Sequence, residues 1–309
     1  MGYIPLKLDV ASALPPELTA GPGAFISAWV FPPLTPPQGV PTVVALLNGG
    51  TYDKRYFHVE IPGRSGYSLA EHLAARGHFV VLLDHLGVGE SSRASDQKRV
   101  TRQVAALANH AALLQVYEAL RWGELDPSLP PVRQFLKIGG GHSMGGMQVI
   151  TQQAAFGDFD RLLVLGYTAA GVHLTVGGHL VSADPGPVDH TKPDYWLADR
   201  HFLRSSFHWE DVPDDVLVVD DALLVEVPNV LSTQSITGGI VTDDASRVEV
   251  PVYICLGEHD VSPDPHAEPS FYSASRDITL HILPRSGHCQ NFASTRLQMY
   301  DRIHRWIAC

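Results

Sequence analysis

Short, continuous apolar runs recur along the chain and predict strands that are buried on both faces. The clearest are Thr42–Asn48 (TVVALLN), His78–Asp84 (HFVVLLD) and Arg161–Leu165 (RLLVL). Such runs are typical of parallel sheets, because helices then cover both faces of each strand. Less regular apolar runs predict the other strands, at Ala24–Phe31, Phe135–Ile138, Val248–Leu256 and Ile278–Leu283.

Segments with a helical spacing of apolar residues separate these strands. The longest is Val104–Trp122, which we expect to bury the face that carries Leu107, Ala111, Leu114 and Tyr117. Other helices are predicted at Tyr67–Arg76 before Gly77, at Met144–Ala155, near Pro269–Arg276 and at Phe292–Ala308. This alternation predicts an α/β fold, with a mostly parallel central sheet flanked by helices.

The alternation stops between Gly166 and Val248, a gap of about eighty residues that is far longer than an ordinary connection. Single histidines and several large aromatic residues are scattered through this gap. We interpret it as an inserted cap or lid with helices of its own, and we assign the cap to residues 170–240. The α/β core is then made of residues 1–169 and residues 241–309.

The charge of the chain limits its possible partners. The 309 residues include 33 acidic and 22 basic side chains, which gives a net charge of −11. We therefore expect no nucleic-acid partner, because a polyanion is repelled overall. No apolar run reaches the ~18 residues of a membrane span, so no membrane partner is expected, and the oligomeric state stays open. The three cysteines are scattered and odd in number, which favours a reducing, cytoplasmic location.

The strongest chemical signal is the sequence Gly141-His142-Ser143-Met144-Gly145-Gly146, which follows a predicted strand and precedes a predicted helix. In this context G-x-S-x-G lifts a serine hydroxyl into the open on a sharp turn. Small residues on both sides permit the crowded backbone. The helix that follows directs free amide groups toward any developing negative charge. The alternative is a glycine-rich turn with a capping serine, whereas no G-x-G-x-x-G is present to bind a dinucleotide.

With these residues the chain resembles the α/β-hydrolase family from about Pro41 to the C-terminus, apart from the predicted cap. The resemblance implies a triad in the chain order serine, acid and histidine, with Ser143 as the nucleophile. It implies His288 as the base, in Ser286-Gly287-His288 after the last predicted strand. It implies Asp260 as the acid, in Gly257-Glu258-His259-Asp260 after the preceding strand. The neighbouring Glu258 is expected to be an exposed carboxylate.

The resemblance also implies an oxyanion hole made of two backbone amides. Met144, the residue after the nucleophile, is expected to supply one amide. The second is expected from Gly50 in the loop Asn48-Gly49-Gly50-Thr51, with Thr51 as the alternative. The family commonly has a histidine where this chain has Asn48, which leaves the side-chain support of this loop open. The loop Asp84–Ser92 resembles the family's D-x-x-G-x-G-x-S and is interpreted as structural.

Aromatic residues near these motifs and in the cap indicate an apolar pocket. Substrate contacts are predicted for residues of the oxyanion loop, the nucleophile turn and the cap, namely Thr51, Tyr52, His142, Trp196, Phe202, Phe207 and Trp209. For each ring of the cap, the alternative is packing within a small core of the cap itself.

The sequence therefore predicts a serine hydrolase that needs no cofactor and no metal, since it contains no H-E-x-x-H or similar ligand pattern. The expected substrate is a carboxylic ester or lactone of a hydrophobic or aromatic small molecule. One alternative is hydrolysis of a carbon–carbon bond by the same triad. Another is a non-enzymatic ligand-binding or signalling protein, because a fold does not fix a function.

Overall fold

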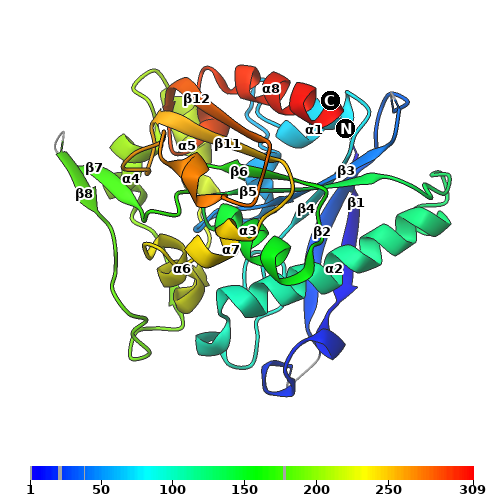
Figure 1. Cartoon of the computed structure of the whole chain (residues 1–309), viewed down its shortest axis with the longest axis horizontal. Coiled ribbons are helices and arrows are strands. Elements are labelled where there is room, and N and C mark those ends of the chain that lie inside the picture. Colours follow the sequence, from blue (N-terminus) through cyan, green and yellow to red (C-terminus); the bar gives the residue numbers. More distant parts are fainter. Residues whose placement is uncertain (1, 20–22, 38, 177–178) are drawn as a thin grey trace.

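The computed structural model describes residues 2–19, 23–37, 39–176 and 179–309, and its centre is an eight-stranded sheet (Figure 1). The strand order is β1-β2-β4-β3-β5-β6-β11-β12. The edge strand β1 (Ile4–Asp9) and its neighbour β2 (Phe25–Phe31) run antiparallel to each other, and β2 is also antiparallel to β4. The remaining strand pairs are parallel. The predicted fold class is confirmed.

Each apolar run that predicted a strand forms a strand of this sheet. The parallel strands are β3 (Thr42–Leu47), β4 (Phe79–Leu83), β5 (Leu136–His142), β6 (Arg161–Leu165), β11 (Val252–His259) and β12 (Ile278–Gly287). The sequence analysis did not single out β1. This strand lies at the edge of the sheet and alternates exposed residues with half-buried or buried ones, so it lacks a continuous apolar run.

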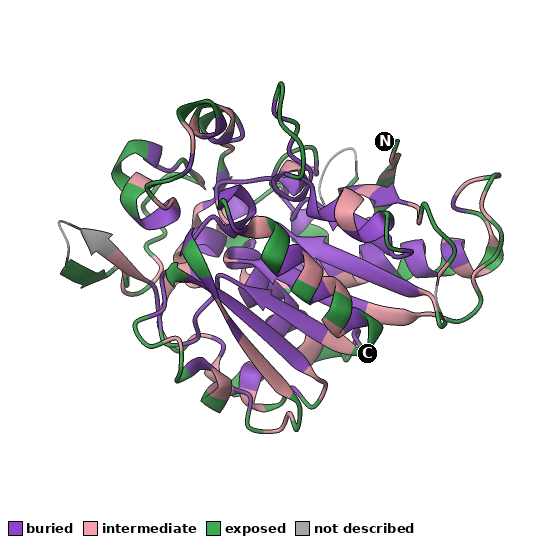
Figure 2. Ribbon diagram, turned by 90° about the horizontal axis from the view of Figure 1, so that it is seen from above, coloured by how far each residue is buried: buried purple, intermediate pink, exposed green. Residues whose placement is uncertain are grey.

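Two apolar cores form because successive side chains of a strand point to opposite faces of the sheet. In β3, Val43, Ala45 and Leu47 pack on one side, and Val44 and Leu46 pack on the other. Helices α2 (Arg102–Trp122), α3 (Met144–Phe156) and α7 (Thr242–Ser246) cover the first face, and α1 (Leu69–Ala74) and α8 (Arg296–Ala308) cover the second. Figure 2 shows the central strands as buried between these layers.

The buried face of α2 differs from the predicted one. Leu114 is 47% exposed and Leu107 is only partly buried, whereas the side chains that face α3 and the sheet are fully buried. These are mostly small, namely Ala105, Ala108, Ala112 and Val116. These side chains belong to the same apolar core as Met144 and Met147 of α3, so α2 buries its alanine face rather than its leucine face. Tyr117 is buried, as expected.

Two predicted helices near the C-terminus are shorter than expected. Instead of a helix over Pro269–Arg276, there is a single 3-10 turn, η5 (Glu268–Phe271), and the Ser275 hydroxyl then donates to the carbonyl of Val250 at 2.8 Å. The final helix begins at Arg296 rather than at Phe292. Before it lies a single 3-10 turn, η6 (Gln290–Phe292), in which the Asn291 side chain donates to the carbonyl of Tyr56 at 2.6 Å.

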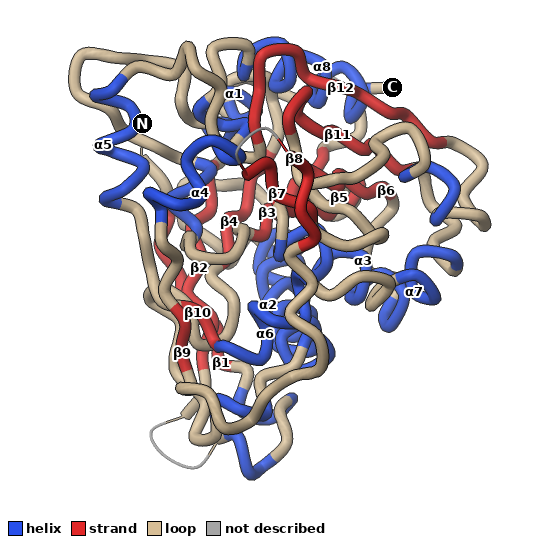
Figure 3. The backbone as a smooth tube through the Cα atoms, turned by 90° about the vertical axis from the view of Figure 1, so that its left-hand side faces the viewer, coloured by secondary structure: helices blue, strands red, loops and turns tan. Residues whose placement is uncertain are grey.

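The segment predicted as a cap lies on the side of the sheet where the parallel strands have their carboxyl ends (Figures 1 and 3). Its elements are β7 (His173–Val176), β8 (His179–Ser182), β9 (Tyr195–Trp196), α4 (Arg200–Phe207), α5 (Asp214–Ala222), β10 (Val227–Pro228) and α6 (Asn229–Ile236). We call residues 170–240 the insertion. Across the described ranges, no helix has both the length and the apolar character needed to cross a membrane.

Candidate active site

Ser143 stands on the bend between β5 and α3 in a backbone conformation that is unusual for a serine. Its φ is 54° and its ψ is −119°. Such a conformation costs on the order of 1–3 kcal/mol for a residue with a Cβ, so the surrounding structure must enforce it. The bend is tight because α3 passes directly over the end of β3, where a Cβ at Gly145 would lie 2.0 Å from the carbonyl oxygen of Leu47.

The structure brings the three predicted triad residues together in one hydrogen-bonded chain. Ser143 Oγ lies 3.0 Å from Nε2 of His288, and Nδ1 of His288 lies 2.7 Å from Oδ1 of Asp260. Asp260 as a carboxylate can only accept a hydrogen bond, so Nδ1 carries the ring proton. Nε2 is then free to accept the hydroxyl proton of Ser143, which is the geometry that a general base requires.

Asp260 is held as an anion although it is buried. Burial alone would raise its pKa, but the charge and hydrogen bond of His288 together with two backbone amides lower the pKa of this carboxyl. The amides of Gly257 and Val261 each donate to it at 2.8 Å. Gln290 Nε2 adds a further hydrogen bond at 3.1 Å, a contact that nothing in the sequence pattern signalled.

The neighbouring carboxylate, Glu258, is exposed and accepts a hydrogen bond from the amide of Arg285 at 2.9 Å. It therefore has the surface role that the sequence analysis expected. Between the two acids, His259 is also exposed, and its ring lies 4.4 Å from the ring of Trp209.

The predicted oxyanion loop packs against the nucleophile turn. A Cβ at Gly49 would lie 2.8 Å from Nδ1 of His142 and 3.2 Å from Cβ of Ser143, so only glycine fits there without displacement. A Cβ at Gly50 would lie 3.9 Å from Cβ of Met144, which places the two predicted amide donors on neighbouring backbone. Met144 is the first residue of α3, and the first amides of a helix have no partner within it.

Asn48 supports the loop from inside. Its Nδ2 donates to the carbonyl oxygens of Gly49 at 3.1 Å and of Tyr52 at 2.5 Å. Nε2 of His85 bonds to the carbonyl of Asn48 at 2.9 Å, and burial lowers the pKa of His85 to about 4, so this ring is neutral and donates from Nε2. The asparagine thus braces the loop through its own side chain, which answers the question that its place in the motif had left open.

The loop after β4 is held by buried charges. Lys54 Nζ lies 2.6 Å from Asp84 and 2.7 Å from Glu90, and both Lys54 and Asp84 are almost completely buried. Asp84 also accepts hydrogen bonds from the amides of Lys54 at 2.7 Å and Glu90 at 2.9 Å. These contacts are structural in kind, and they tie this loop to the segment that follows the oxyanion loop.

Two predicted substrate residues lie beside the triad. Phe207 is buried, and its ring lies 5.0 Å from the ring of His288. His142 is also buried, and its Nε2 bonds to the carbonyl of His288 at 2.8 Å while its ring stacks on Tyr56 at 4.5 Å. Burial lowers the pKa of His142 to about 3. These contacts give His142 the role of holding His288 in place.

The predicted substrate residues of the insertion other than Phe207 do not gather at the triad. Trp196 is 41% exposed and Phe202 is 57% exposed, so both rings lie on the outer surface of the insertion. Trp209 lines a separate cavity of about 640 Å³ next to the exposed His259. Thr51 and Tyr52 are buried, Thr51 with a φ of 70°, and Tyr52 contacts charged residues of the insertion.

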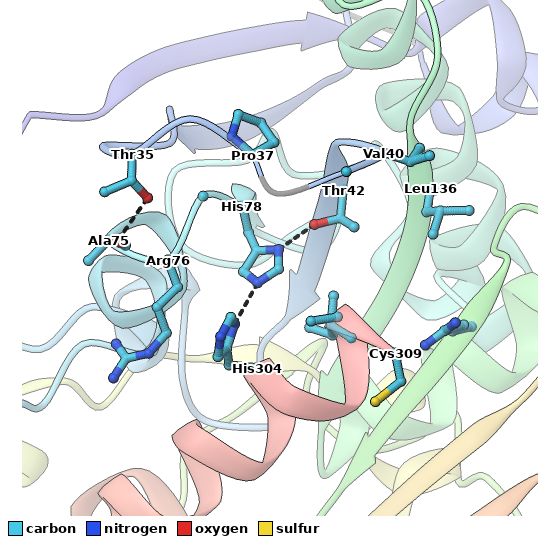
Figure 4. A pocket seen from close by; sticks show the side chains of 15 residues that line it. Thr35, Pro37, Val40, Thr42, Ala75, Arg76, His78, Leu136, His304 and Cys309 are labelled. Carbon is cyan, nitrogen blue, oxygen red and sulfur yellow. Dashed lines mark hydrogen bonds between the residues drawn. The ribbon is translucent and has the colours of Figure 1, made fainter.

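A further cavity, of about 560 Å³, lies at the opposite end of the parallel strands from Ser143 (Figure 4). Its lining includes Thr42 and Leu136, which begin β3 and β5, together with His78 and His304. Because it opens at the amino ends of the parallel strands, it is not part of the site around Ser143. Over the part of the chain that the structure describes, no group of three or more His, Cys, Asp or Glu side chains could hold a metal ion.

Comparison with known proteins places the chain in a family. Residues 44–297 match the family model described as the alpha/beta hydrolase family. A search of curated proteins finds no significant match. Solved structures with the same fold include an esterase from Exiguobacterium antarcticum, which is 16% identical with a TM-score of 0.65 and a coverage of 94% of this chain and 98% of that one.

Two more solved structures show the same architecture at low identity. A monoacylglycerol lipase from Paleococcus ferrophilus is 17% identical with a TM-score of 0.60, covering 92% of this chain and 98% of that one. An N-acyl homoserine lactonase is 15% identical with a TM-score of 0.58, covering 99% of this chain and 96% of that one. At such identities the likeness is one of fold. Since the family model matches most of the chain, the protein belongs to the alpha/beta hydrolase family.

Proposed function

We propose that this hydrolase cleaves a carboxylic ester or lactone through an acyl-enzyme on Ser143. The observation that carries the proposal is the chain of hydrogen bonds from Asp260 to His288 at 2.7 Å and from His288 to Ser143 at 3.0 Å. The positive φ of Ser143, 54°, supports the same conclusion, because backbone strain of this kind concentrates at functional sites.

In the first step Ser143 Oγ attacks the carbonyl carbon while His288 Nε2 takes the hydroxyl proton. The resulting imidazolium is stabilised by the ionised Asp260. When the tetrahedral intermediate collapses, the carbon–oxygen bond of the ester breaks and His288 returns the proton to the leaving alcohol. Water then attacks the acyl-enzyme with His288 again as base, which releases the acid and restores Ser143.

The negative charge of each intermediate falls on the former carbonyl oxygen. We assign its stabilisation to the amides of Gly50 and Met144, which lie on adjacent backbone at the turn. Amides that are already in place at the start of the reaction cost no reorganisation, and one such donor is worth on the order of 3 kcal/mol. Asn48 keeps Gly50 in place by bonding the carbonyls on either side of it.

A hydrophobic or aromatic substrate is favoured by the ring of Phe207, which is buried and 5.0 Å from His288. The insertion would act as the cap of this site, since α4 ends at Phe207 beside the triad. Structural neighbours that are named as an esterase, a lipase and a lactonase are consistent with ester and lactone chemistry.

The test is steady-state hydrolysis of a panel of esters and lactones by the wild-type chain and by Ser143→Ala. We expect multiple-turnover release of acid and alcohol by the wild type, and a loss of kcat on the order of 10⁴-fold or more in the variant. Ser294→Ala, which removes an exposed serine far along the chain, serves as the control and should keep full activity. Hydrolysis that persists in Ser143→Ala would refute the proposal, and cleavage of a diketone with no alcohol product would point to carbon–carbon bond hydrolysis.

A further inference from the structure

A buried polar network joins the insertion to the oxyanion loop. The Tyr52 hydroxyl, on the segment just after that loop, donates to Oδ1 of Asp220 on α5 at 2.5 Å. Arg200, the first residue of α4, donates from Nη1 to the same hydroxyl at 2.9 Å. His208 Nε2 lies 2.8 Å from Oδ2 of Asp220. The hydroxyl of Tyr52 is thus shared between two helices of the insertion, and it also lies 3.1 Å from Sγ of Cys289, the residue after His288.

Backbone contacts of the insertion reach the same two parts of the site. The amide of Val225 donates to the carbonyl of Thr51 at 3.0 Å, directly after the predicted donor Gly50. On the other side, the amide of His288 donates to the carbonyl of Ser206 at 3.0 Å. The insertion therefore bonds the backbone of the base and of the oxyanion loop at once, and the network around Tyr52 lies between these two attachments.

The network contains buried charges, and removing charges from water costs free energy. Burial opposes ionisation of Asp220, yet the hydrogen bond from His208 and the charge of Arg200 lower the pKa of its carboxyl, so Asp220 is an anion at neutral pH. Arg200 has only 7% of its surface exposed. Buried charges of this kind are often matched in stability by apolar residues of the same size. Unlike apolar contacts, the hydrogen bonds of the buried charges are directional, so each one fixes the position of its partner.

The oxyanion loop has a strained backbone, which the network around Tyr52 can hold in place. Thr51 has a φ of 70°, a conformation that a β-branched residue rarely adopts. The carbonyl of Thr51 accepts the amide of Val225, and the carbonyl of Tyr52 accepts Asn48. Tyr52 is itself fully buried, with its ring 4.0 Å from the guanidinium carbon of Arg200.

We propose that Asp220 and Arg200 are positioning residues, which act through Tyr52 to hold the oxyanion loop in its reactive geometry. The inference rests on the proposed function of Ser143 for its effect on catalysis, but not for its effect on the loop. Neither residue acts on the substrate here. Each fixes Tyr52, and Tyr52 fixes the backbone on which Gly50 lies.

The chain offers a matched control between the same two helices. Arg204 of α4 and Asp221 of α5 form an ion pair at 2.6 Å, but this pair is on the surface and makes no contact with Tyr52 in the described structure. Asp221→Asn therefore removes one link between α4 and α5, as Asp220→Asn does, while it leaves the Tyr52 network intact. Tyr52→Phe deletes only the shared hydroxyl and provides a second variant if Asp220→Asn does not fold.

The experiment combines amide hydrogen exchange over residues 48–54 with the kinetics of ester hydrolysis. Asp220→Asn and Tyr52→Phe should raise the exchange rate of this peptide at least about fivefold and lower kcat about 10- to 100-fold, with KM changed less than about threefold. Asp221→Asn should match the wild type in both. A KM effect without a kcat effect would assign the network to substrate binding and overturn the proposal.

The exchange measurement separates failure of this inference from failure of the proposed function. Equal exchange in Asp220→Asn, Tyr52→Phe and Asp221→Asn would overturn the network as a support of the loop, whatever the activity. Faster exchange in the first two, in a chain whose hydrolysis does not depend on Ser143, would uphold the support of the loop and remove the proposed function. Conservation of kcat despite faster exchange would overturn the link to catalysis.

Discussion

At the scale of single residues, the site depends on how closely three backbone segments approach one another. The oxyanion loop, the nucleophile turn and the end of β3 are packed so tightly that side-chain atoms are excluded at several points, Gly49 and Gly145 among them. The glycines of the G-x-S-x-G motif are therefore needed because larger side chains would clash at the turn. For this reason the sequence alone indicates the turn at Ser143. Gln290 and Asp220 carry no comparable pattern, so only the folded chain reveals them.

Replacement of Gly49 by alanine tests this close approach. The new Cβ would lie 2.8 Å from Nδ1 of His142 and 3.2 Å from Cβ of Ser143, so the loop or the turn must move. We expect Gly49→Ala to lower kcat roughly 10- to 100-fold, because a displacement of about 1 Å at a reactive centre is enough for such a loss. The measurement is steady-state kinetics beside a circular dichroism spectrum of the variant. A folded Gly49→Ala with wild-type kcat would show that the approach is not required.

At the scale of elements, hydrophobic patterning predicted the parallel strands well and the helices less well. A strand such as β3 is buried on both faces, so its apolar run is unambiguous. For α2 the same rule selected the wrong face, because a leucine stripe at helical spacing is exposed in part while the alanines are fully buried. The bounds of the insertion stay a prediction, and its elements could not be predicted, since its short strands pair with one another and follow no single period.

The corrected face of α2 predicts a large effect on stability for one substitution and a small effect for another. Ala108→Leu places three extra carbon atoms in a fully buried contact and should lower the free energy of unfolding by about 1–3 kcal/mol. Leu114→Ala removes carbon atoms from a side chain that is 47% exposed and should change stability by less than about 1 kcal/mol. Urea unfolding of both variants is the measurement. A larger loss of unfolding free energy in Leu114→Ala than in Ala108→Leu would show that α2 buries the leucine face that the periodicity predicted.

At the scale of the whole molecule, neutral histidines are built into the fold. Burial lowers the pKa of His72, His78, His85 and His281 to about 4 and that of His142 to about 3. A histidine in an unfolded chain has a pKa of about 6.5. As the pH falls below that value, these histidines take up protons in the unfolded state but not in the folded state, until about pH 4. The free energy of unfolding therefore decreases as the pH falls from about 6.5 to about 4.

The melting temperature should therefore decrease by several degrees as the pH is lowered from about 7 to about 5. His78→Gln should make this decrease smaller, because it removes one of the buried groups that the unfolded state protonates. His266→Gln, at an exposed position, should leave the slope as it is. Differential scanning calorimetry at several pH values gives the slopes. A melting temperature that stays constant or rises as the pH falls through this window would contradict the prediction.

The proposed function depends on Oγ of Ser143 being the atom that becomes acylated. The most direct measurement is mass spectrometry of the protein after reaction with a fluorophosphonate, which traps an activated serine, followed by mapping of the modified peptide. We predict one adduct per chain, on the peptide that contains Ser143, with complete loss of ester hydrolysis. His288→Gln should form the adduct at least about a hundredfold more slowly, because the serine then lacks its base. An adduct on a different residue, or full hydrolysis by a chain fully modified at Ser143, would contradict the account.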